Sequence, residues 1–366
     1  VVVGKNPHVL TLDQGTDDPT HVYTINKDDH SLSVIDVADF EAVPDELQLR
    51  PFFDTLVFSP DGSKAISYIA GEITAEDLEG QGSVNRNEIA ILDLAGDERS
   101  VEFRTLDARP TDVVFSADGL KALIPMKTDL SVLYLPEEGE PDVVNYPFSL
   151  DSADPAQPSM VETSPDSTRA FAAVAGESDV YIIDLDQKIF ETLIPTPFAP
   201  TDIQVTADGE HTVVVGGSTK VVIFDNDVFE PETLTVDSIA RRIVPAGDAE
   251  TPLLFLYNDA QSHDTFTTIE FDEGAPEVET YVTEAKIADV QVDPTGQAAV
   301  LVHVENNFGA GGVSLFNLAE SQPSYIDLES PAHSMTFLDT EDPAIEPTGY
   351  VMVVLKEART LVRIGL

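Results

Sequence analysis

The sequence contains no cysteine, and this absence excludes several classes of site at once. Disulfides, thiolate-bound metals, cysteine nucleophiles and iron–sulfur clusters all need the missing side chain. A chain of 366 residues without one thiol fits a protein that works outside the cytoplasm and avoids stray thiol chemistry. We therefore expect an extracytoplasmic location, which means the periplasm, the cell surface or the secreted fraction.

Basic residues are scarce, because 19 Lys and Arg stand against 67 Asp and Glu, which gives a formal charge of −48. Nucleic-acid binding needs Lys and Arg gathered on one face, so we expect no nucleic-acid partner. Adhesion to anionic membranes is disfavoured for the same reason. No apolar run approaches the roughly 20 residues that span a bilayer. With 42 % hydrophobic residues, the composition is that of a globular protein and not of a disordered acidic tail.

No stretch carries a sustained period of 3.6 residues, so we expect almost no helix. The chain instead has an internal repeat that is built on a short turn phrase. Each copy stands between two runs of alternating or β-branched residues, and its Asp-Gly pair suits the positive φ of a tight hairpin turn. The copies are Phe58–Gly62, Phe115–Gly119, Thr163–Ser167, Thr206–Gly209 and Val292–Gly296.

A second phrase follows each hairpin and reads as a third strand. Clear copies are Ser31–Val37, Glu88–Leu94, Asp179–Leu185 and Lys220–Asn226, and weaker ones are Leu130–Leu135, Thr265–Phe271, Gly312–Leu318 and Thr360–Leu366. Eight copies in 366 residues give units of about 46 residues, most with a fourth, irregular strand. Four short antiparallel strands per unit are typical of a β-propeller blade. The sequence predicts an all-β fold, a single domain over residues 1–366 that forms an eight-bladed β-propeller of four-stranded antiparallel blades.

The two ends of the chain indicate how the ring closes. The last unit stops after its third strand, whereas the first has a surplus apolar segment, Val1–Lys5, ahead of its first strand. We expect Val1–Lys5 to supply the outer strand of the last blade, which would close the ring and cover its sheet edges. The alternative is seven blades with an irregular N-terminal extension.

One stretch resembles a known repeat family. The strand Val22–Asn26, the polar turn Asp28–His30 and the strand Ser31–Asp36 resemble the YVTN-type propeller repeat. The chain is also similar to the broader lactonase-like bacterial or archaeal propellers, which share these phrases. The resemblance implies the fold, because the matched residues are turn and core positions. For function it implies a range of surface-layer and adhesion modules, sugar-lactone hydrolases and cofactor-bearing oxidoreductase domains.

In such a propeller, the first strand of each blade begins at one mouth of the central channel. Alignment of the units places these ionisable residues there: His8, Asp54, Asp112, Asp202, Arg241 or its neighbour Arg242, Asp289 and His333. One interpretation is a ring that binds a divalent cation or a polyhydroxy ligand, because carboxylates with imidazoles suit such cations. The other is that each Asp caps a loop by accepting hydrogen bonds from backbone N–H groups. We favour the second interpretation and expect no cofactor, with a divalent cation at the mouth as the alternative.

Catalytic motifs are missing too, because the sequence has neither GxSxG nor HExxH.

Two connections between second and third strands, 70–87 and the glycine-rich 306–312, should project from the face that carries the mouth residues. Long loops inside compact repeats are usually either functional or disordered. We therefore predict a non-catalytic binding or scaffold propeller that recognises a protein or a glycan through this loop-decorated face. The alternatives are a lactonase-like metal-dependent hydrolase and a structural module of a cell-surface assembly.

Overall fold

The structure is a computed structural model. It describes residues 2–12, 20–39, 41–74, 83–96, 98–136, 139–149, 156–247, 250–260, 262–271, 275–293, 298–304, 311–317, 323–339, 349–355 and 360–365. Every element in these ranges is a β-strand, and none of them contains a helix that could cross a membrane. The chain divides into two compact units, Val1–Leu193 and Ile194–Leu366, and each is described by itself.

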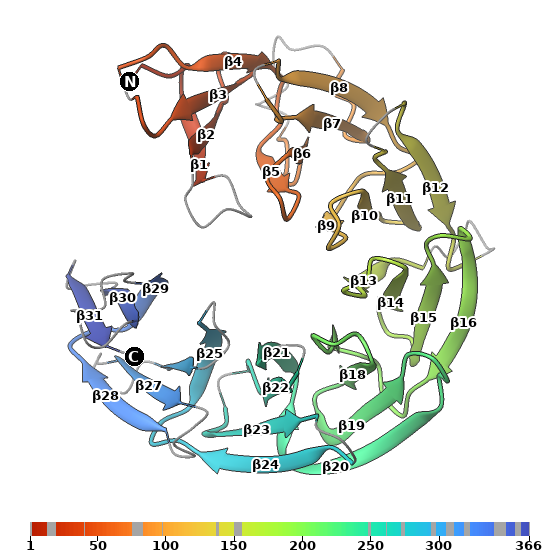
Figure 1. The fold of residues 1–366 in the computed structure, drawn as a ribbon, viewed down its shortest axis with the longest axis vertical. Coiled ribbons are helices and arrows are strands. Elements are labelled where there is room, and N and C mark those ends of the chain that lie inside the picture. Colours follow the sequence, from red (N-terminus) through yellow and green to blue (C-terminus); the bar gives the residue numbers. More distant parts are fainter. Residues whose placement is uncertain are drawn as a thin grey trace. The chain divides into compact units, whose positions relative to one another are not determined.

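The first unit contains four sheets, in each of which consecutive strands pair antiparallel (Figure 1). The first two sheets are β1 (Pro7–Leu12), β2 (His21–Asn26), β3 (Ser31–Asp36) and β4 (Asp45–Gln48), then β5 (Thr55–Phe58), β6 (Lys64–Tyr68), β7 (Glu88–Asp93) and β8 (Ser100–Thr105). The next two are β9 (Val114–Phe115), β10 (Lys121–Pro125), β11 (Leu130–Tyr134) and β12 (Asp142–Tyr146), then β13 (Pro158–Thr163), β14 (Arg169–Val174), β15 (Asp179–Asp184) and β16 (Ile189–Pro195).

The second unit repeats the pattern in four further sheets. The first two are β17 (Asp202–Val205), β18 (His211–Val215), β19 (Ser218–Asp225) and β20 (Pro231–Ala240), then β21 (Arg242–Gly247), β22 (Pro252–Tyr257), β23 (Thr265–Glu270) and β24 (Glu277–Val282). The last two are β25 (Ile287–Val292), β26 (Ala298–His303), β27 (Gly311–Asn317) and β28 (Ser324–Leu328), then β29 (Ala332–Asp339), β30 (Gly349–Leu355) and β31 (Leu361–Gly365).

Eight successive sheets of this kind are the blades of an eight-bladed β-propeller. The prediction of an all-β fold with eight blades is confirmed, and the expected strands agree with the observed ones to within a few residues. In the described residues the last sheet has three strands, and residues 2–5 are not part of a strand. Closure of the ring by Val1–Lys5 therefore stays a prediction, as does the single domain.

Four of the five predicted hairpin turns share one hydrogen-bond network, and the fifth, Val292–Gly296, lies partly outside the described residues. In the second sheet the Ser59 hydroxyl donates to Asp61 Oδ1 over 2.6 Å and accepts from the Lys64 N–H over 3.0 Å. The same pair recurs in the next three turns as Ser116 with Asp118, Ser164 with Asp166 and Thr206 with Asp208. The glycine of the phrase has a φ near +70° in three of these turns. In the Ser164–Asp166 turn, Ser167 replaces the glycine and has a φ of 62°. This explains why Asp-Gly recurs at these positions.

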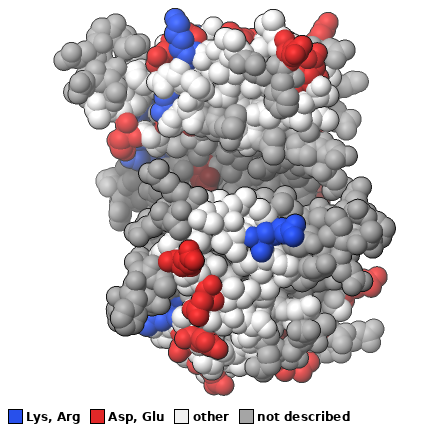
Figure 2. Space-filling model, turned by 90° about the vertical axis from the view of Figure 1, so that its left-hand side faces the viewer, with Lys and Arg blue, Asp and Glu red and all other residues white. Residues whose placement is uncertain are grey.

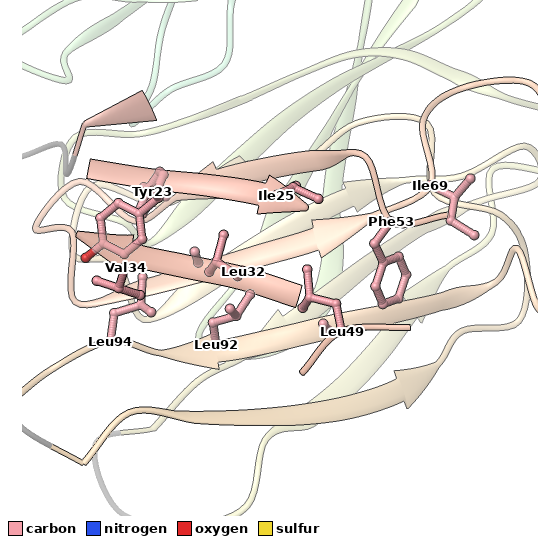
Figure 3. Close-up of a cluster of buried hydrophobic side chains, with 12 residues drawn as sticks. Tyr23, Ile25, Leu32, Val34, Leu49, Phe53, Ile69, Leu92 and Leu94 are labelled. Carbon is pink, nitrogen blue, oxygen red and sulfur yellow. The ribbon is translucent and has the colours of Figure 1, made fainter. Parts of the chain in front are cut away.

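The apolar core lies between neighbouring sheets. In the first such layer, side chains of β2 and β3 pack against those of β5, β6 and β7. Figure 3 shows Leu32 and Val34 of β3 facing Leu92 of β7 and Leu94, which follows it. Similar clusters join the second sheet to the third, the third to the fourth, and each pair of successive sheets in the second unit. Each sheet is therefore packed on at least one face against a neighbouring sheet of the same unit.

Candidate functional site

A hollow of about 510 Å³ lies between the first and second sheets of the first unit. It lies at the strand ends where the β2–β3 turn, the β4–β5 connection and the start of the β6–β7 connection come together. Its lining combines charged, polar and apolar side chains: Asn6, Lys27, Asp28, His30, Phe52, Asp54, Gly71, Glu72 and Ile73.

One wall of the hollow is the β2–β3 turn. The backbone N–H of Lys27 donates to the carbonyl of Asn6 over 3.1 Å, and the Asn6 amide donates to Asp28 Oδ1 over 3.1 Å. Asn6, His30 and Phe52 all have positive φ, at 54°, 53° and 70°. Such a backbone costs energy in residues other than glycine and is concentrated at functional sites. The Nδ1 atom of His30 is buried and has no hydrogen-bond partner in the described part of the chain.

The facing wall is held by Asp54, one of the predicted mouth residues. Its Oδ1 accepts from the Ala70 N–H over 2.8 Å, and its Oδ2 accepts from the Gly71 N–H over 2.9 Å. A Cβ atom on Gly71 would lie 2.5 Å from that Oδ2, so a larger residue here would displace the Asp54 carboxylate. Asp54 therefore fixes the start of the β6–β7 connection, as the loop-capping interpretation requires.

Two arginines hold the same connection from outside the hollow. The Arg109 guanidinium donates to the carbonyls of Ala70 and Gly71 over 2.7 and 2.8 Å. Arg86 donates to the carbonyl of Ile73 over 2.9 Å. Both arginines also approach the carboxylate of Glu72, at 3.4 Å from Arg109 and 3.6 Å from Arg86. Residues 70–73 thus have a fixed conformation, and the Glu72 side chain stays 83 % exposed above the hollow.

The floor of the hollow is apolar. Phe52 and Ile73 pack against the buried cluster between the first two sheets. Phe53, Leu49 and Ile69 belong to that cluster and are drawn in Figure 3. A second hollow of about 350 Å³, lined in part by Phe53, Ile69 and Val84, lies against the second described end of the 70–87 connection. The glycine-rich segment 306–312 lies outside the described residues apart from Gly311 and Gly312, which begin β27.

Two other predicted mouth residues belong to the first unit. Asp112 is exposed, and its Oδ1 accepts a hydrogen bond from the N–H of Val113 over 2.8 Å. Burial, together with the negative charges of Asp112 and Asp54, raises the pKa of Tyr68 to about 12. The two aspartates therefore lie near the same tyrosine. His8, on β1, is exposed and does not line the hollow.

The aspartates of the second unit also bind backbone donors. Asp202 accepts from the N–H groups of Ile203 and Ile243 over 3.0 and 2.9 Å, and burial raises its pKa despite these bonds. Asp289 accepts from the N–H of Val290 over 2.9 Å and from the Tyr257 hydroxyl over 3.1 Å. These contacts are those of loop and strand caps, and a cation-binding role for the ring stays a prediction.

The predicted arginines form their hydrogen bonds with Asp259, although the charge of Arg242 also acts on Asp202 and opposes the effect of burial on its pKa. Arg241 and Arg242 both donate to Asp259, over 2.9 and 2.8 Å. Burial would raise the pKa of Asp259, but the two hydrogen bonds outweigh it and lower the pKa. His333 lies on β29, and its side chain is outside the described residues.

One group in the described residues has ligand atoms close enough for a metal ion: Asp208, Glu210 and His211 in the second unit. Asp208 belongs to the shared turn network. The residue at the position of His211 is a base in the three preceding turns, namely Lys64, Lys121 and Arg169. Lys121 lies 3.3 Å from Asp118, and His211 has the equivalent position next to Asp208, so their proximity follows from the shared turn.

The sequence alone did not indicate a role in the site for Lys27, His30, Glu72 or either loop-binding arginine. The sequence predicts only a polar turn at Asp28–His30, since nothing local indicates that this turn faces the second sheet. Arginine itself was the available signal for Arg86, because Lys and Arg total only 19 and this residue lies within the long connection.

No protein-family model matches the chain, and no curated protein matches it in sequence. Among solved structures it is similar to the dihydro-heme d1 dehydrogenase NirN in complex with DHE, with a TM-score of 0.59 and 13 % identity over 95 % of this chain and 73 % of that one. It is similar to apo AztD from Citrobacter koseri, with a TM-score of 0.50 and 13 % identity over 78 % of this chain and 74 % of that one. A third similar structure is the Cps50 (Swd1) β-propeller domain of Myceliophteria thermophila. Its TM-score is 0.49, with 10 % identity over 100 % of this chain and 98 % of that one. At these identities the similarity concerns the fold alone, so membership of the YVTN-type or lactonase-like families stays a prediction.

Proposed function

We propose that this chain is a non-catalytic binding module that holds a protein partner at the hollow between its first two sheets. The observation that carries the proposal is the fixed start of the β6–β7 connection. Asp54, Arg86 and Arg109 together occupy the backbone groups of residues 70, 71 and 73. A loop that is ordered before binding loses less entropy on binding, which favours recognition.

The composition of the hollow fits a protein surface. Phe52 and Ile73 supply an apolar floor, while Lys27, Asp28 and Glu72 supply a charged rim of both signs. An apolar centre with a polar rim is the usual anatomy of a protein–protein interface. No observation on the described residues favours the glycan alternative. We therefore keep only the protein partner.

The contacts favour binding over hydrolysis. A lactonase-like mechanism would use a carboxylate at this mouth as a general base or a metal ligand. Both oxygens of Asp54 are already engaged by the N–H groups of Ala70 and Gly71. Asp54 is thus a structural cap in this proposal, and the partner contacts Lys27, Asp28 and Glu72 instead.

We also propose that this binding takes place outside the cytoplasm. The absence of cysteine and the charge of −48 support this location. Fractionation of the source cells with immunoblotting tests it, and we expect the protein in the periplasmic, surface or secreted fraction. Recovery with a cytoplasmic marker would contradict the location and leave the binding proposal standing.

Site-specific photo-cross-linking tests the binding proposal. A benzophenone amino acid replaces Ile73 at the hollow, and a matched variant carries it at Val228, which is 60 % exposed in the second unit. After irradiation in extract of the source cells, the protein captured at position 73 but not at 228 is identified and purified. Its affinity is then measured for the wild type and for Glu72→Gln and Asp28→Asn.

We expect a product specific to position 73, and an affinity that falls several-fold in each charge variant because a rim contact is lost. A captured protein that binds the wild type and both variants equally would contradict the proposal. So would the same set of products at positions 73 and 228.

A further inference from the structure

A second surface with its own chemistry lies on β24, the outer strand of the sixth sheet. Glu277 and Glu279 are two residues apart, so their side chains lie on the same face of this strand. Glu270 on β23 is the direct cross-strand partner of Glu277, and all three carboxylates are exposed. Like charges in direct opposition destabilise a sheet. This arrangement therefore costs stability unless a cation compensates it.

No such cation is found in the described residues of the second unit. Arg241 and Arg242 there pair with Asp259, and among the described residues no ion pair reaches Glu270, Glu277 or Glu279. The outer strands of the first unit differ, because each carries a carboxylate paired with a base at 2.9 Å or less. These pairs are Asp45 with Arg99, Glu102 with Arg104, Asp142 with Lys188 and Glu191 with Arg169.

The three carboxylates border a hollow of about 300 Å³ between the sixth and seventh sheets. Tyr281, on the same face of β24, and Phe316 of β27 form its aromatic wall, with ring centroids 4.9 Å apart. The Tyr281 ring also stacks on Phe266 at 5.1 Å, and its hydroxyl donates to Glu279. A cation that reaches this hollow would meet both negative charge and an aromatic face, and each of them attracts it.

The backbone of β24 offers a further means of binding. In its sheet β24 pairs with β23 on one side and is the last strand on the other, as Figure 1 shows. An edge strand presents N–H and C=O groups that an extended peptide can pair with. Side chains on one face of such an added strand recur at every second residue, which is the spacing of Glu277 and Glu279.

We propose that β24 binds an extended basic segment of a partner protein by strand addition. Lys or Arg at alternate positions of that segment pairs with Glu277, Glu279 and Glu270, and one cationic head lies against the Tyr281 ring. Arginine suits the position against the Tyr281 ring best, because its planar guanidinium can pair with a carboxylate and stack on an aromatic ring at the same time. The site lies in the second unit and does not depend on the hollow of the first.

Fluorescence anisotropy with synthetic peptides and the full chain tests this proposal. One labelled peptide alternates arginine with threonine, and a second has the same composition with its arginines adjacent. A third repeats the alternating sequence with N-methyl groups that block backbone pairing. We expect the alternating peptide to bind at least about tenfold more tightly than either of the others. Only this peptide can both pair its backbone with the edge of β24 and place its arginines against the three carboxylates.

Two chain variants with equal charge change locate the site. The variant E277Q/E279Q should weaken binding of the alternating peptide by about tenfold, since it removes two ion pairs. The control E230Q/E232Q changes two exposed glutamates at the start of β20 and should alter the affinity by less than about twofold. Equal binding of all three peptides, or equal weakening by the two variants, would mean that only the net charge attracts arginine and would overturn the proposal.

Discussion

At the scale of single residues, short polar side chains stabilise turns and loops by the same hydrogen bonds in several sheets. A Ser or Thr two residues before an Asp fixes four of the hairpin turns, and Asp54 and Asp202 fix loops by accepting two backbone hydrogen bonds each. The turn phrases could be predicted, because Asp-Gly determines local geometry whatever surrounds it. The contacts of Arg109 could not, because its acceptors lie 38 and 39 residues away in the chain.

The role of Asp54 leads to the first prediction. Asp54→Ala removes the acceptors of the Ala70 and Gly71 N–H groups and should lower the free energy of unfolding by about 1 kcal/mol, as for other lost backbone caps. Hydrogen exchange of residues 69–73 should also become faster. The control is Asp112→Ala, which removes a single bond from an exposed carboxylate and should have a smaller effect. Equal losses in urea denaturation would show that the loop cap is not what stabilises this region.

A buried histidine gives a prediction on pH. His303 is 2 % exposed, its Nε2 lies 2.7 Å from the Ser314 hydroxyl, and burial lowers its pKa below the usual 6.5. The folded state therefore binds this proton more weakly than the unfolded state. Its contribution to stability is complete above about pH 6.5 and declines as the pH falls through this region.

The measurement is the free energy of unfolding at about pH 7.5 and about pH 5.5 for the wild type and for His303→Gln. The wild type should lose more stability on acidification than the variant, whatever their difference at the higher pH. A variant with the same pH slope as the wild type would contradict this role of His303.

At the scale of elements, strands and their faces followed from the sequence, whereas the packing partners of the loops did not. Strand β7 is a short apolar run that ends in Leu-Asp, so its position was predicted to within one residue. A strand pattern indicates which residues are buried, and neighbouring sheets then bury them against each other. No comparable sequence pattern indicates the position of the hollow. The hollow arises where positive-φ residues of the first sheet meet an arginine-bound loop of the second.

The interface between sheets gives the third prediction. Leu92 of β7 is fully buried between the first and second sheets. Leu92→Ala should reduce the free energy of unfolding by about 2–5 kcal/mol, because it removes buried methyl groups and leaves a cavity. The control is Val43→Ala, at a side chain that is 90 % exposed, and it should change stability by less than about 0.5 kcal/mol. Comparable losses in the two variants would contradict the assignment of this layer as core.

At the scale of the whole molecule, the excess of negative charge is the dominant feature. On the face shown in Figure 2, acidic and basic side chains are interspersed among uncharged residues. With a net charge of −48, repulsion still acts between the carboxylates that lack a basic partner. Salt screens this repulsion, since the screening length falls from about 30 Å at 0.01 M to about 3 Å at 1 M.

We expect the melting temperature to rise by several degrees between these NaCl concentrations at neutral pH. Differential scanning calorimetry in NaCl and in KCl separates general screening, which should be the same in both, from binding of one cation. A melting temperature that does not change with either salt would show that the charges are too dispersed to affect stability.

The central claim is that a partner recognises the arginine-bound loop above the hollow of the first unit. Arg109 does not line the hollow, so its substitution tests the loop and not a direct contact. The most direct measurement is the dissociation constant of the partner captured at position 73 for Arg109→Gln and for Arg104→Gln, whose arginine only pairs with Glu102 on an outer strand. We predict about tenfold weaker binding for Arg109→Gln and a change of less than about twofold for Arg104→Gln. Unchanged affinity in Arg109→Gln, with the fold intact, would contradict the account.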